Sequence, residues 1–401
     1  MNGIKDIVIV GGGSSAWLTA AYLSNQLQKF NYTIIDKEIG TPVGVGEATL
    51  LNFERFMELC GFPLSEWYEE IEATDKLGIE FPNWIEKGHH VYHPFNVRTE
   101  NYQESLKKRL DDSSNVAYHI NCGLLTTFIQ NRIKNKVKFI ASEVVSFEND
   151  KLFLKNGETI GGDLFIDCTG FKSILKKKRD RVELRNRLIC DTAVASHVPY
   201  INESAEKLPY VKCEAVDEGW VWTIPVKSRM GSGFLFNRNI TDIEKAKQFL
   251  SNYWSGRVKP DDLKVIDWTP YYDKNIWDNN VVSVGLSAGF IEPLESTSLA
   301  LCMEGAYQIS KRIVKNFYNN RDIDIYNKQM EIFFNNSIDF VNMHYIISKR
   351  PGKFWEEGRK LDKSDSMMYY ENNLKENLNG HILNDSDFFT GNNWKCWLKQ
   401  I

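Results

Sequence analysis

The sequence predicts an α/β fold organised around a parallel sheet, and stretches near its start carry this prediction. Residues 7–10 form a short, fully apolar strand that runs into a turn of Gly11, Gly12 and Gly13. A helix follows over about residues 17–23, and a second apolar strand over residues 33–36 comes next. The order of strand, glycine turn, helix and strand is typical of a nucleotide-binding βαβ unit.

The glycine turn reads as G-x-G-x-x-A, a pattern that binds dinucleotides. Gly11 permits the tight turn, Gly13 lets the backbone approach a pyrophosphate, and Ala16 lets the helix pack on the strand. The phosphates then lie at the helix N-terminus, where free N–H groups favour anions. Asp36 ends the second strand, at the position where a ribose hydroxyl is held. We therefore expect a dinucleotide site rather than an ordinary glycine-rich turn.

The composition excludes several other classes of protein. With 401 residues, of which 42% are hydrophobic and 25% charged, the chain is long enough for one large core or two joined ones. A net charge of −4 with interspersed signs argues against nucleic acid as a partner, and residues 176–179, the one basic run, are typical of a solvated loop. Seven scattered cysteines without C-x-x-C spacing indicate neither a disulfide framework nor a metal site.

No targeting or membrane segment is predicted. The N-terminus carries Asp6 and the glycine turn where a signal peptide needs an unbroken apolar core, and no stretch approaches the length of a membrane span. Together with the cysteine pattern, which favours a reducing compartment, this predicts a cytoplasmic protein. Nothing in the sequence excludes a homo-oligomer.

The region after the second strand begins with a loop and two helical patterns. Loop 41–49 contains glycines and a carboxylate, and it is interpreted either as a connecting turn or as a strap beside a flat cofactor ring. Helical patterns cover residues 51–59 and 66–71.

A strand with two possible substrate-binding residues follows. Apolar and polar residues alternate over residues 76–81, which places Lys76 and Glu80 on one strand face and predicts an ordinary exposed lysine. The imidazole of His93 and the ring of Phe95 come next. Such a group suits a clamp for a planar substrate and is equally common in a packed loop.

Strand patterns return in the middle of the chain, which predicts a sheet built from distant pieces. They cover residues 137–145, 151–154 and 163–170. Between about 185 and 270 the pattern alternates and is rich in aromatic residues, with Trp220, Trp222 and Ile224 on one face. This face is an aromatic wall, a core face of the sheet, or both.

The last informative stretch is a strand at 281–285 that leads into a long helix at about 299–318. Glu292, Glu295 and three hydroxyls lie just before this helix. Two interpretations stay open, because these residue types cap helices and the same free N–H groups also bind small anions. Helical patterns to about residue 347 and a polar tail complete the chain.

With these segments in place, the chain resembles the flavin-dependent halogenases of the tryptophan halogenase family, within the FAD-binding monooxygenase fold. The resemblance extends to His344-Tyr345 and rests on the motifs GGGSSAW (11–17), VGVGEAT (43–49), ATDKLGIEFPNW (73–84), LFIDCTGF (164–171), WVWTIP (220–225) and GLSAGFIEPLEST (285–297). It implies an FAD-binding Rossmann-like domain with an inserted antiparallel sheet and a helical C-terminal part. We expect the FAD-binding domain to comprise residues 1–50, 135–175 and 275–320, and the substrate-binding and helical module to comprise residues 51–134, 176–274 and 321–401.

The resemblance also implies roles for individual residues. Lys76 is expected to receive hypohalous acid, with Glu295 paired with it as the catalytic carboxylate. The lysine either hydrogen-bonds this oxidant as an ammonium or forms a haloamine, and both remain open. The expected cofactor-binding residues are Gly11, Gly13, Ser14, Ser15, Ala16, Asp36, Gly46, Glu47, Ala48, Thr49 and Gly285; the halide site is Thr297 and Ser298; the substrate is flanked by His93 and Phe95, and Trp220 and Trp222 separate it from the flavin.

The implied reaction uses reduced FAD and oxygen to oxidise a halide, and the hypohalous acid then halogenates an electron-rich indole or phenol. A separate flavin reductase is expected to supply FADH2. Ser298 stands where the family usually has glycine, which favours bromide or iodide as well as chloride. The chain ends soon after Tyr345, so a more open pocket is expected, and a varied or carrier-bound aromatic substrate rather than free tryptophan. The alternatives are a single-component flavin hydroxylase and a non-catalytic flavin-binding protein.

Overall fold

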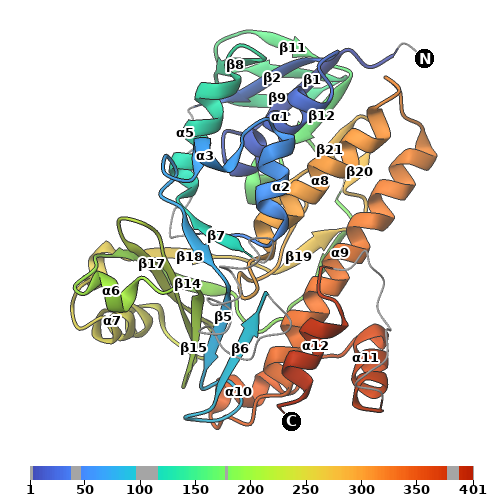
Figure 1. The fold of residues 1–401 in the computed structure, drawn as a ribbon. Coiled ribbons are helices and arrows are strands. Elements are labelled where there is room, and N and C mark those ends of the chain that lie inside the picture. Colours follow the sequence, from blue (N-terminus) through green and yellow to red (C-terminus); the bar gives the residue numbers. More distant parts are fainter. Residues whose placement is uncertain (1–2, 38–46, 96–115, 177–178, 377–387, 401) are drawn as a thin grey trace.

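Two large sheets lie at opposite ends of the molecule, and three small sheets and several helices complete the fold (Figure 1). Helices α8 (Thr297–Ile313) and α9 (Asn320–Ile346) run beside the sheets. Helix α9 extends from the parallel sheet toward the end of the molecule that holds the second large sheet. Within the described part of the chain, no helix combines the length and apolar character that a bilayer span requires. The computed structural model describes residues 3–37, 47–95, 116–176, 179–376 and 388–400.

The predicted parallel sheet is present and contains six strands in the order β20-β21-β12-β1-β2-β8. Ile9 pairs with Ile34 on one side and with Ile166 on the other, so pieces far apart in the chain lie side by side. Only β20 runs antiparallel to its neighbour. The strands are β1 (Asp6–Val10), β2 (Asn31–Asp36), β8 (Val137–Ala141), β12 (Leu164–Asp167), β20 (Trp277–Asp278) and β21 (Val281–Ser283).

Different elements pack on the two faces of this sheet. Ile7 and Ile9 point toward helix α1 (Ser14–Gln26) and belong to the largest hydrophobic core. Val8 and Phe165 point the other way and pack with Leu152 and Leu154 of a small antiparallel sheet. Helix α5 packs on α1, and α8 does so as well. The bounds are α5 (Cys122–Ile133), β9 (Val144–Glu148), β10 (Lys151–Leu154) and β11 (Thr159–Gly161).

The second large sheet has seven strands in the order β18-β14-β17-β16-β15-β5-β6 and is antiparallel except between β15 and β5. Trp220, Trp222 and Ile224 lie on one face, in the largest core, as period two predicts, whereas Val221 faces helix α7 (Ile243–Tyr253) in a separate core. The strands are β5 (Gly78–Pro82), β6 (His90–Pro94), β14 (Thr192–Val198), β15 (Val211–Val216), β16 (Gly219–Pro225), β17 (Met230–Phe236) and β18 (Lys264–Asp267).

The predicted strand around Lys76 is in fact two strands in two sheets. Lys76 ends β4 (Thr74–Lys76), which belongs to a three-stranded sheet with β3 (Glu47–Ala48) and β7 (Ala117–Ile120). Leu77 is the crossover, and β5 begins in the seven-stranded sheet at the next residue. Lys76 and Glu80 therefore do not share a strand face, and the prediction of an exposed Lys76 was wrong because the side chain points into the interior.

The remaining elements are short or lie near the C-terminus. The helical pattern at 51–59 is confirmed, whereas the one at 66–71 is wrong in its extent, because that helix is a single turn that ends at Trp67. The helices are α2 (Asn52–Leu59), α3 (Leu64–Trp67), α6 (Glu203–Glu206), α10 (Lys353–Gly358), α11 (Asp365–Glu376) and α12 (Gly391–Leu398); the strands are β13 (Arg181–Glu183), β19 (Tyr271–Asp273) and β22 (Gly289–Phe290).

Candidate active site

The glycine turn leaves room for a ligand at the N-terminus of α1. Gly11 has a φ of 121°, and a Cβ atom there would lie 2.3 Å from the carbonyl oxygen of Cys168. Gly13, by contrast, has no atom within 4 Å of the place where a Cβ would stand, although it caps a helix whose next residues are largely buried. This open cradle beside free helical N–H groups fits a pyrophosphate. Ser14 and Ser15 line the same space, and Ala16 is fully buried against the sheet.

Asp36 lies next to this turn at the end of β2. The preceding residue, Ile35, accepts a hydrogen bond from the backbone N–H of Gly11 at 2.9 Å. Asp36 itself is half-buried. This is the geometry expected for an acid that holds a ribose beside a bound pyrophosphate.

The predicted strap is described only in part, since Gly46 lies outside the described residues. Glu47 and Ala48 form β3 and pair with β7. Thr49 is fully buried, and its hydroxyl accepts a hydrogen bond from the backbone N–H of Tyr118 at 2.9 Å. Glu47 and Ala48 therefore lie in the same small sheet as Lys76.

An apolar pocket of about 440 Å³ connects the glycine turn with the residues before α8. Its wall includes Gly13 and Gly285 on one side, Trp220 and Trp222 on another, and Ser296. Apolar walls with a few polar groups are typical of sites for planar cofactors. The Trp222 ring packs directly on Gly233, because a Cβ at Gly233 would overlap it at 2.0 Å.

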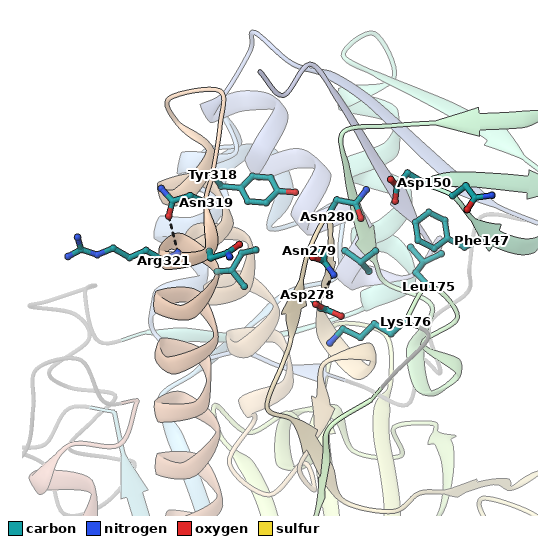
Figure 2. Close-up of a pocket in the computed structure, with 14 residues that line it drawn as sticks. Phe147, Asp150, Leu175, Lys176, Asp278, Asn279, Asn280, Tyr318, Asn319 and Arg321 are labelled. Carbon is teal, nitrogen blue, oxygen red and sulfur yellow. Dashed lines mark hydrogen bonds between the residues drawn. The ribbon is translucent and has the colours of Figure 1, made fainter. Parts of the chain in front are cut away.

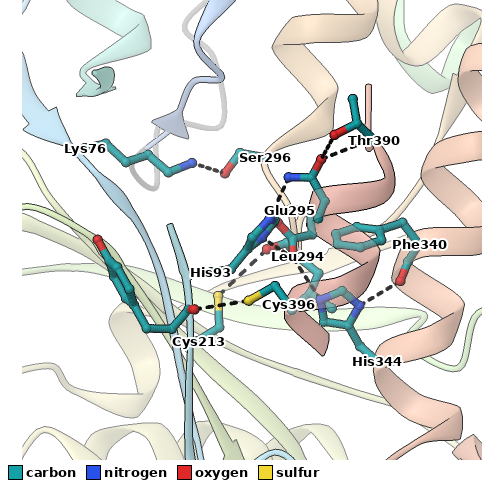
Figure 3. A network of polar contacts seen from close by, with 12 residues as sticks. Lys76, His93, Cys213, Leu294, Glu295, Ser296, Phe340, His344, Thr390 and Cys396 are labelled. Atoms are coloured by element: carbon teal, nitrogen blue, oxygen red, sulfur yellow. Dashed lines mark hydrogen bonds and ion pairs between the residues drawn. The ribbon is translucent and has the colours of Figure 1, made fainter. Parts of the chain in front are cut away.

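Lys76 is fully buried and, although it does not line this pocket itself, it bonds to Ser296 of the pocket wall (Figure 3). Its ammonium nitrogen donates to the backbone oxygen of Thr49 and to the hydroxyl of Ser296, both at 2.9 Å, and it lies 4.9 Å from the centre of the Phe95 ring. Burial lowers the pKa of Lys76 from 10.5 to about 7, although the charges of Glu295 and Cys213 oppose the shift. A lysine with this pKa exists both as a neutral amine and as an ammonium near neutral pH.

Glu295 is also fully buried, but it forms its ion pairs with two histidines rather than with Lys76 (Figure 3). One carboxylate oxygen lies 2.8 Å from Nε2 of His344, and Nδ1 of His93 lies 3.1 Å from the other. Burial raises the pKa of Glu295, but the charge of His93 and hydrogen bonds from both histidines outweigh it and lower the pKa to about 2. The group is therefore a carboxylate.

The start of α8 has unusual capping. Ser296, the N-cap residue, has a φ of 61°, and its side chain makes no hydrogen bond to the helix. Its hydroxyl faces Lys76 instead. Thr297 is buried, and its hydroxyl has no hydrogen-bond partner within the described residues; Ser298 is half-buried and lines the apolar pocket. The first-turn N–H groups thus lack the side-chain acceptor that an N-cap serine ordinarily supplies.

Several residues of this site were missed by the sequence analysis. Ser296 carries no distinguishing signal, and His344 was noted only as the end of the resemblance. Asn393, in α12, contacts Nε2 of His93 at 2.9 Å, and the Trp397 ring lies 4.0 Å from the His344 ring. The C-terminal helix thus covers this side of the site, which differs from the open pocket expected.

A second hollow, of about 1000 Å³, lies elsewhere (Figure 2). It is polar and is lined by residues such as Lys176, Asp278, Asn319 and Arg321, at the start of α9. None of the predicted site residues contributes to its wall.

Halogenases, one of them described as flavin-dependent, are among the solved structures that superpose on this chain. One from Xanthomonas campestris superposes with a TM-score of 0.91 at 25% identity, covering 99% of this chain and 89% of that chain. A tryptophan 6-halogenase from Streptomyces toxytricini gives a TM-score of 0.88 at 26% identity, covering 98% and 90%. The fold and the site therefore define an FAD-dependent oxidoreductase.

The chain belongs to the tryptophan halogenase family, whose sequence profile matches residues 6–108 and 98–400. It is 28% identical to a tryptophan 6-halogenase from Streptomyces albogriseolus, over 91% of this chain and 81% of the relative. A tryptophan 7-halogenase from Lentzea aerocolonigenes is 27% identical over 91% and 80%. The protein is accordingly a flavin-dependent halogenase that uses FADH2.

Proposed function

We propose that this enzyme passes hypohalous acid from the flavin pocket to Lys76, which delivers the halogen to an electron-rich indole or phenol. The observation that carries the proposal is the position of the Lys76 amine. It is fully buried and bonded to Ser296, a residue that also lines the apolar pocket next to the glycine turn. A buried amine at the end of a flavin pocket has little structural value, because burying a lysine costs free energy.

FAD is held, in this proposal, by the glycine turn and its neighbours. Gly11, Gly13 and the first turn of α1 bind the pyrophosphate, Asp36 the ribose, and residues 46–49 with Gly285 the ring system. Bound FADH2 and oxygen supply the oxidising equivalents that turn a halide into hypohalous acid. A separate flavin reductase supplies the FADH2.

The halide binds at the start of α8. Because the Ser296 side chain faces Lys76, the N–H groups of Thr297 and Ser298 are left for an anion at the positive end of the helix. The buried Thr297 hydroxyl, which has no partner in the described structure, is a further donor. The Ser298 side chain enlarges the polar surroundings and favours bromide or iodide alongside chloride.

Lys76 acts as the acceptor of hypohalous acid. With a pKa of about 7, about half of the amine is neutral at pH 7. The neutral amine exchanges an N–H bond for an N–halogen bond and releases water, whereas the ammonium hydrogen-bonds the oxidant. The haloamine takes up a proton at its nitrogen as the halogen passes to a ring carbon of the substrate, and the neutral amine is thereby released.

Glu295 removes the proton that the ring carbon loses. A carboxylate held by His93 and His344 is already charged and oriented, so it stabilises the cationic ring and accepts its proton without rearrangement. Phe95, whose ring lies beside Lys76, and His93 flank the substrate, while Trp220 and Trp222 separate it from the flavin. This separation directs the oxidant to Lys76 rather than into solvent.

A reductase-coupled assay tests the proposal. A panel of indoles, phenols and free tryptophan is incubated with chloride, bromide or iodide, and products are identified by mass. We expect halogenated indoles or phenols, and loss of halogenation with retained FAD binding in Lys76→Met. Products that carry oxygen instead of halogen, formed without halide, would contradict the proposal.

The chain offers a matched control for Glu295. Glu292 is another fully buried carboxylate, three residues earlier, and it accepts a hydrogen bond from the Tyr345 hydroxyl. Glu295→Gln should lower the rate of halogenation strongly, and Glu292→Gln should leave it close to that of the wild type. Equal effects of the two substitutions would mean that Glu295 has no special role.

A further inference from the structure

The C-terminal helix α12 contributes an amide whose orientation is set by the helix itself. Asn393 forms a capping box with Thr390: the backbone N–H of Thr390 donates to Oδ1 of Asn393 at 2.7 Å, and the Thr390 hydroxyl donates at 3.0 Å. A backbone N–H can only donate, so the atom it contacts is the amide oxygen. The amide nitrogen of Asn393 must then point the other way, toward His93.

This orientation decides where His93 carries its proton. The amide nitrogen of Asn393 lies 2.9 Å from Nε2 of His93, and because it donates, Nε2 accepts. When the His93 ring carries a single proton, that proton is therefore on Nδ1. That atom lies 3.1 and 3.2 Å from the two oxygens of Glu295, so His93 donates to the carboxylate.

The second histidine at Glu295 is fixed from the opposite side. Nδ1 of His344 lies 2.7 Å from the backbone oxygen of Phe340, which can only accept, so Nδ1 carries a proton. Nε2 of His344 lies 2.8 Å from Glu295, and two acceptors this close need a proton between them. The contact between Glu295 and His344 thus holds a proton that the two groups share: burial lowers the pKa of His344, which drives the proton off the ring, and the charge of Glu295 opposes this. The charge of Glu295 in turn raises the pKa values of Lys76, Cys213 and Cys396, the other titratable groups near it.

We propose that Asn393 is a positioning residue that locks His93 as the Nδ1–H tautomer, and thereby confines proton exchange at Glu295 to its contact with His344 (Figure 3). Because Nδ1 carries the proton and Nε2 accepts from the amide of Asn393, His93 always donates a hydrogen bond to Glu295 and does not relay protons. The inference rests on the proposed role of Glu295 as the base, and it extends the active site to a helix that begins about 300 residues after His93.

Nitrogen-15 NMR of the histidine rings in the full-length protein tests this directly. The chain has seven histidines, and His93→Gln assigns the His93 signal. We expect the singly protonated His93 ring of the wild type to be the Nδ1–H tautomer. Finding the Nε2–H tautomer, or an even mixture of the two, overturns the proposal without the need for any Asn393 variant.

Two substitutions at neighbouring positions distinguish an effect on the protonation of His93 from a general effect of added charge. Asn393→Asp keeps an oxygen for Thr390 but places an acceptor against Nε2, so His93 should take up a second proton and the pH–rate profile should move. Asn392→Asp adds the same charge to an exposed position on the same helix and should change neither. Identical ring signals and pH–rate profiles in the two variants would refute the inference.

Asn393→Ala removes the amide without adding charge. The ratio of the Nδ1–H to the Nε2–H tautomer of His93 should then fall by about two- to twelvefold, the factor that one neutral hydrogen bond provides. The kcat should fall by a factor of the same order, and KM should change little. Should halogenation survive both Lys76→Met and Glu295→Gln, the proposed function fails. The tautomer of His93 is measured without turnover and is judged separately.

Discussion

Replacing Lys76 by methionine should stabilise the protein near neutral pH while it abolishes halogenation. Burial lowers the pKa of Lys76 from 10.5 to about 7, which corresponds to about 5 kcal/mol at about 1.4 kcal/mol per pH unit. Below pH 7 both the folded and the unfolded chain carry the charge, and the whole cost of burying it opposes folding. Between pH 7 and 10.5 the unfolded chain holds more protons, so the free energy of unfolding rises with pH, by about 4 kcal/mol.

Methionine has a similar length and no charge, so Lys76→Met removes this dependence. It also deprives Thr49 and Ser296 of a donor, which costs about 1 kcal/mol each. The net result should be a gain of about 2 kcal/mol at pH 7 and a loss of about 2 kcal/mol near pH 10.5. The two curves of unfolding free energy against pH therefore cross.

Urea unfolding of the wild type and Lys76→Met at several pH values measures this difference. Because all other groups titrate alike in both proteins, subtracting one curve from the other isolates Lys76. A difference that stays constant with pH, or a variant that is less stable at pH 7, would refute the assignment of a strongly perturbed lysine. FAD binding by the variant checks that the site is intact.

Other perturbations concern the glycines and the second buried carboxylate. Gly13→Ala should leave the unfolding free energy nearly unchanged yet weaken FAD binding about tenfold or more. Gly11→Ala should cost about 1–3 kcal/mol of stability. Flavin titration measures the first effect and urea unfolding the second. Burial raises the pKa of Glu292 from 4.5 to about 8, so the folded form holds a proton that the unfolded form loses, and stability falls as pH rises through this window. Glu292→Gln should therefore gain about 4 kcal/mol over the wild type between pH 4.5 and pH 8 in denaturation experiments. Gly233→Ala should displace the Trp222 indole and cost about 1–3 kcal/mol, with a change in tryptophan fluorescence on FAD binding; an unaltered spectrum would argue against the packing described.

The strand, glycine turn and helix that we propose to hold FAD could be predicted because their signal is local. The strand, the glycine turn, the helix and Asp36 follow one another within the first residues of the chain, and the backbone geometry that binds phosphate is set by those neighbours. Alternation likewise placed Trp220, Trp222 and Ile224 on one face, since a strand obliges successive side chains to alternate.

The catalytic half could not be predicted from local pattern. The alternation around Lys76 continues through Leu77, and nothing in it shows that the chain leaves one sheet and enters another there. The resemblance alone pointed to Lys76. Contacts such as Asn393 to His93 join residues about 300 positions apart and depend on how α12 docks, which no short-range pattern encodes.

The crossover at Leu77 also limits how this enzyme can be redesigned. Its backbone N–H bonds to Pro209 at 2.8 Å, and its carbonyl accepts from Phe95 at 3.0 Å, so the joint is clamped on both sides. A chimera that combines the cofactor half of one halogenase with the substrate half of another would misplace the amine if its splice fell here. Residues 86–88, the exposed part of the turn between β5 and β6, are the safer boundary for such recombination.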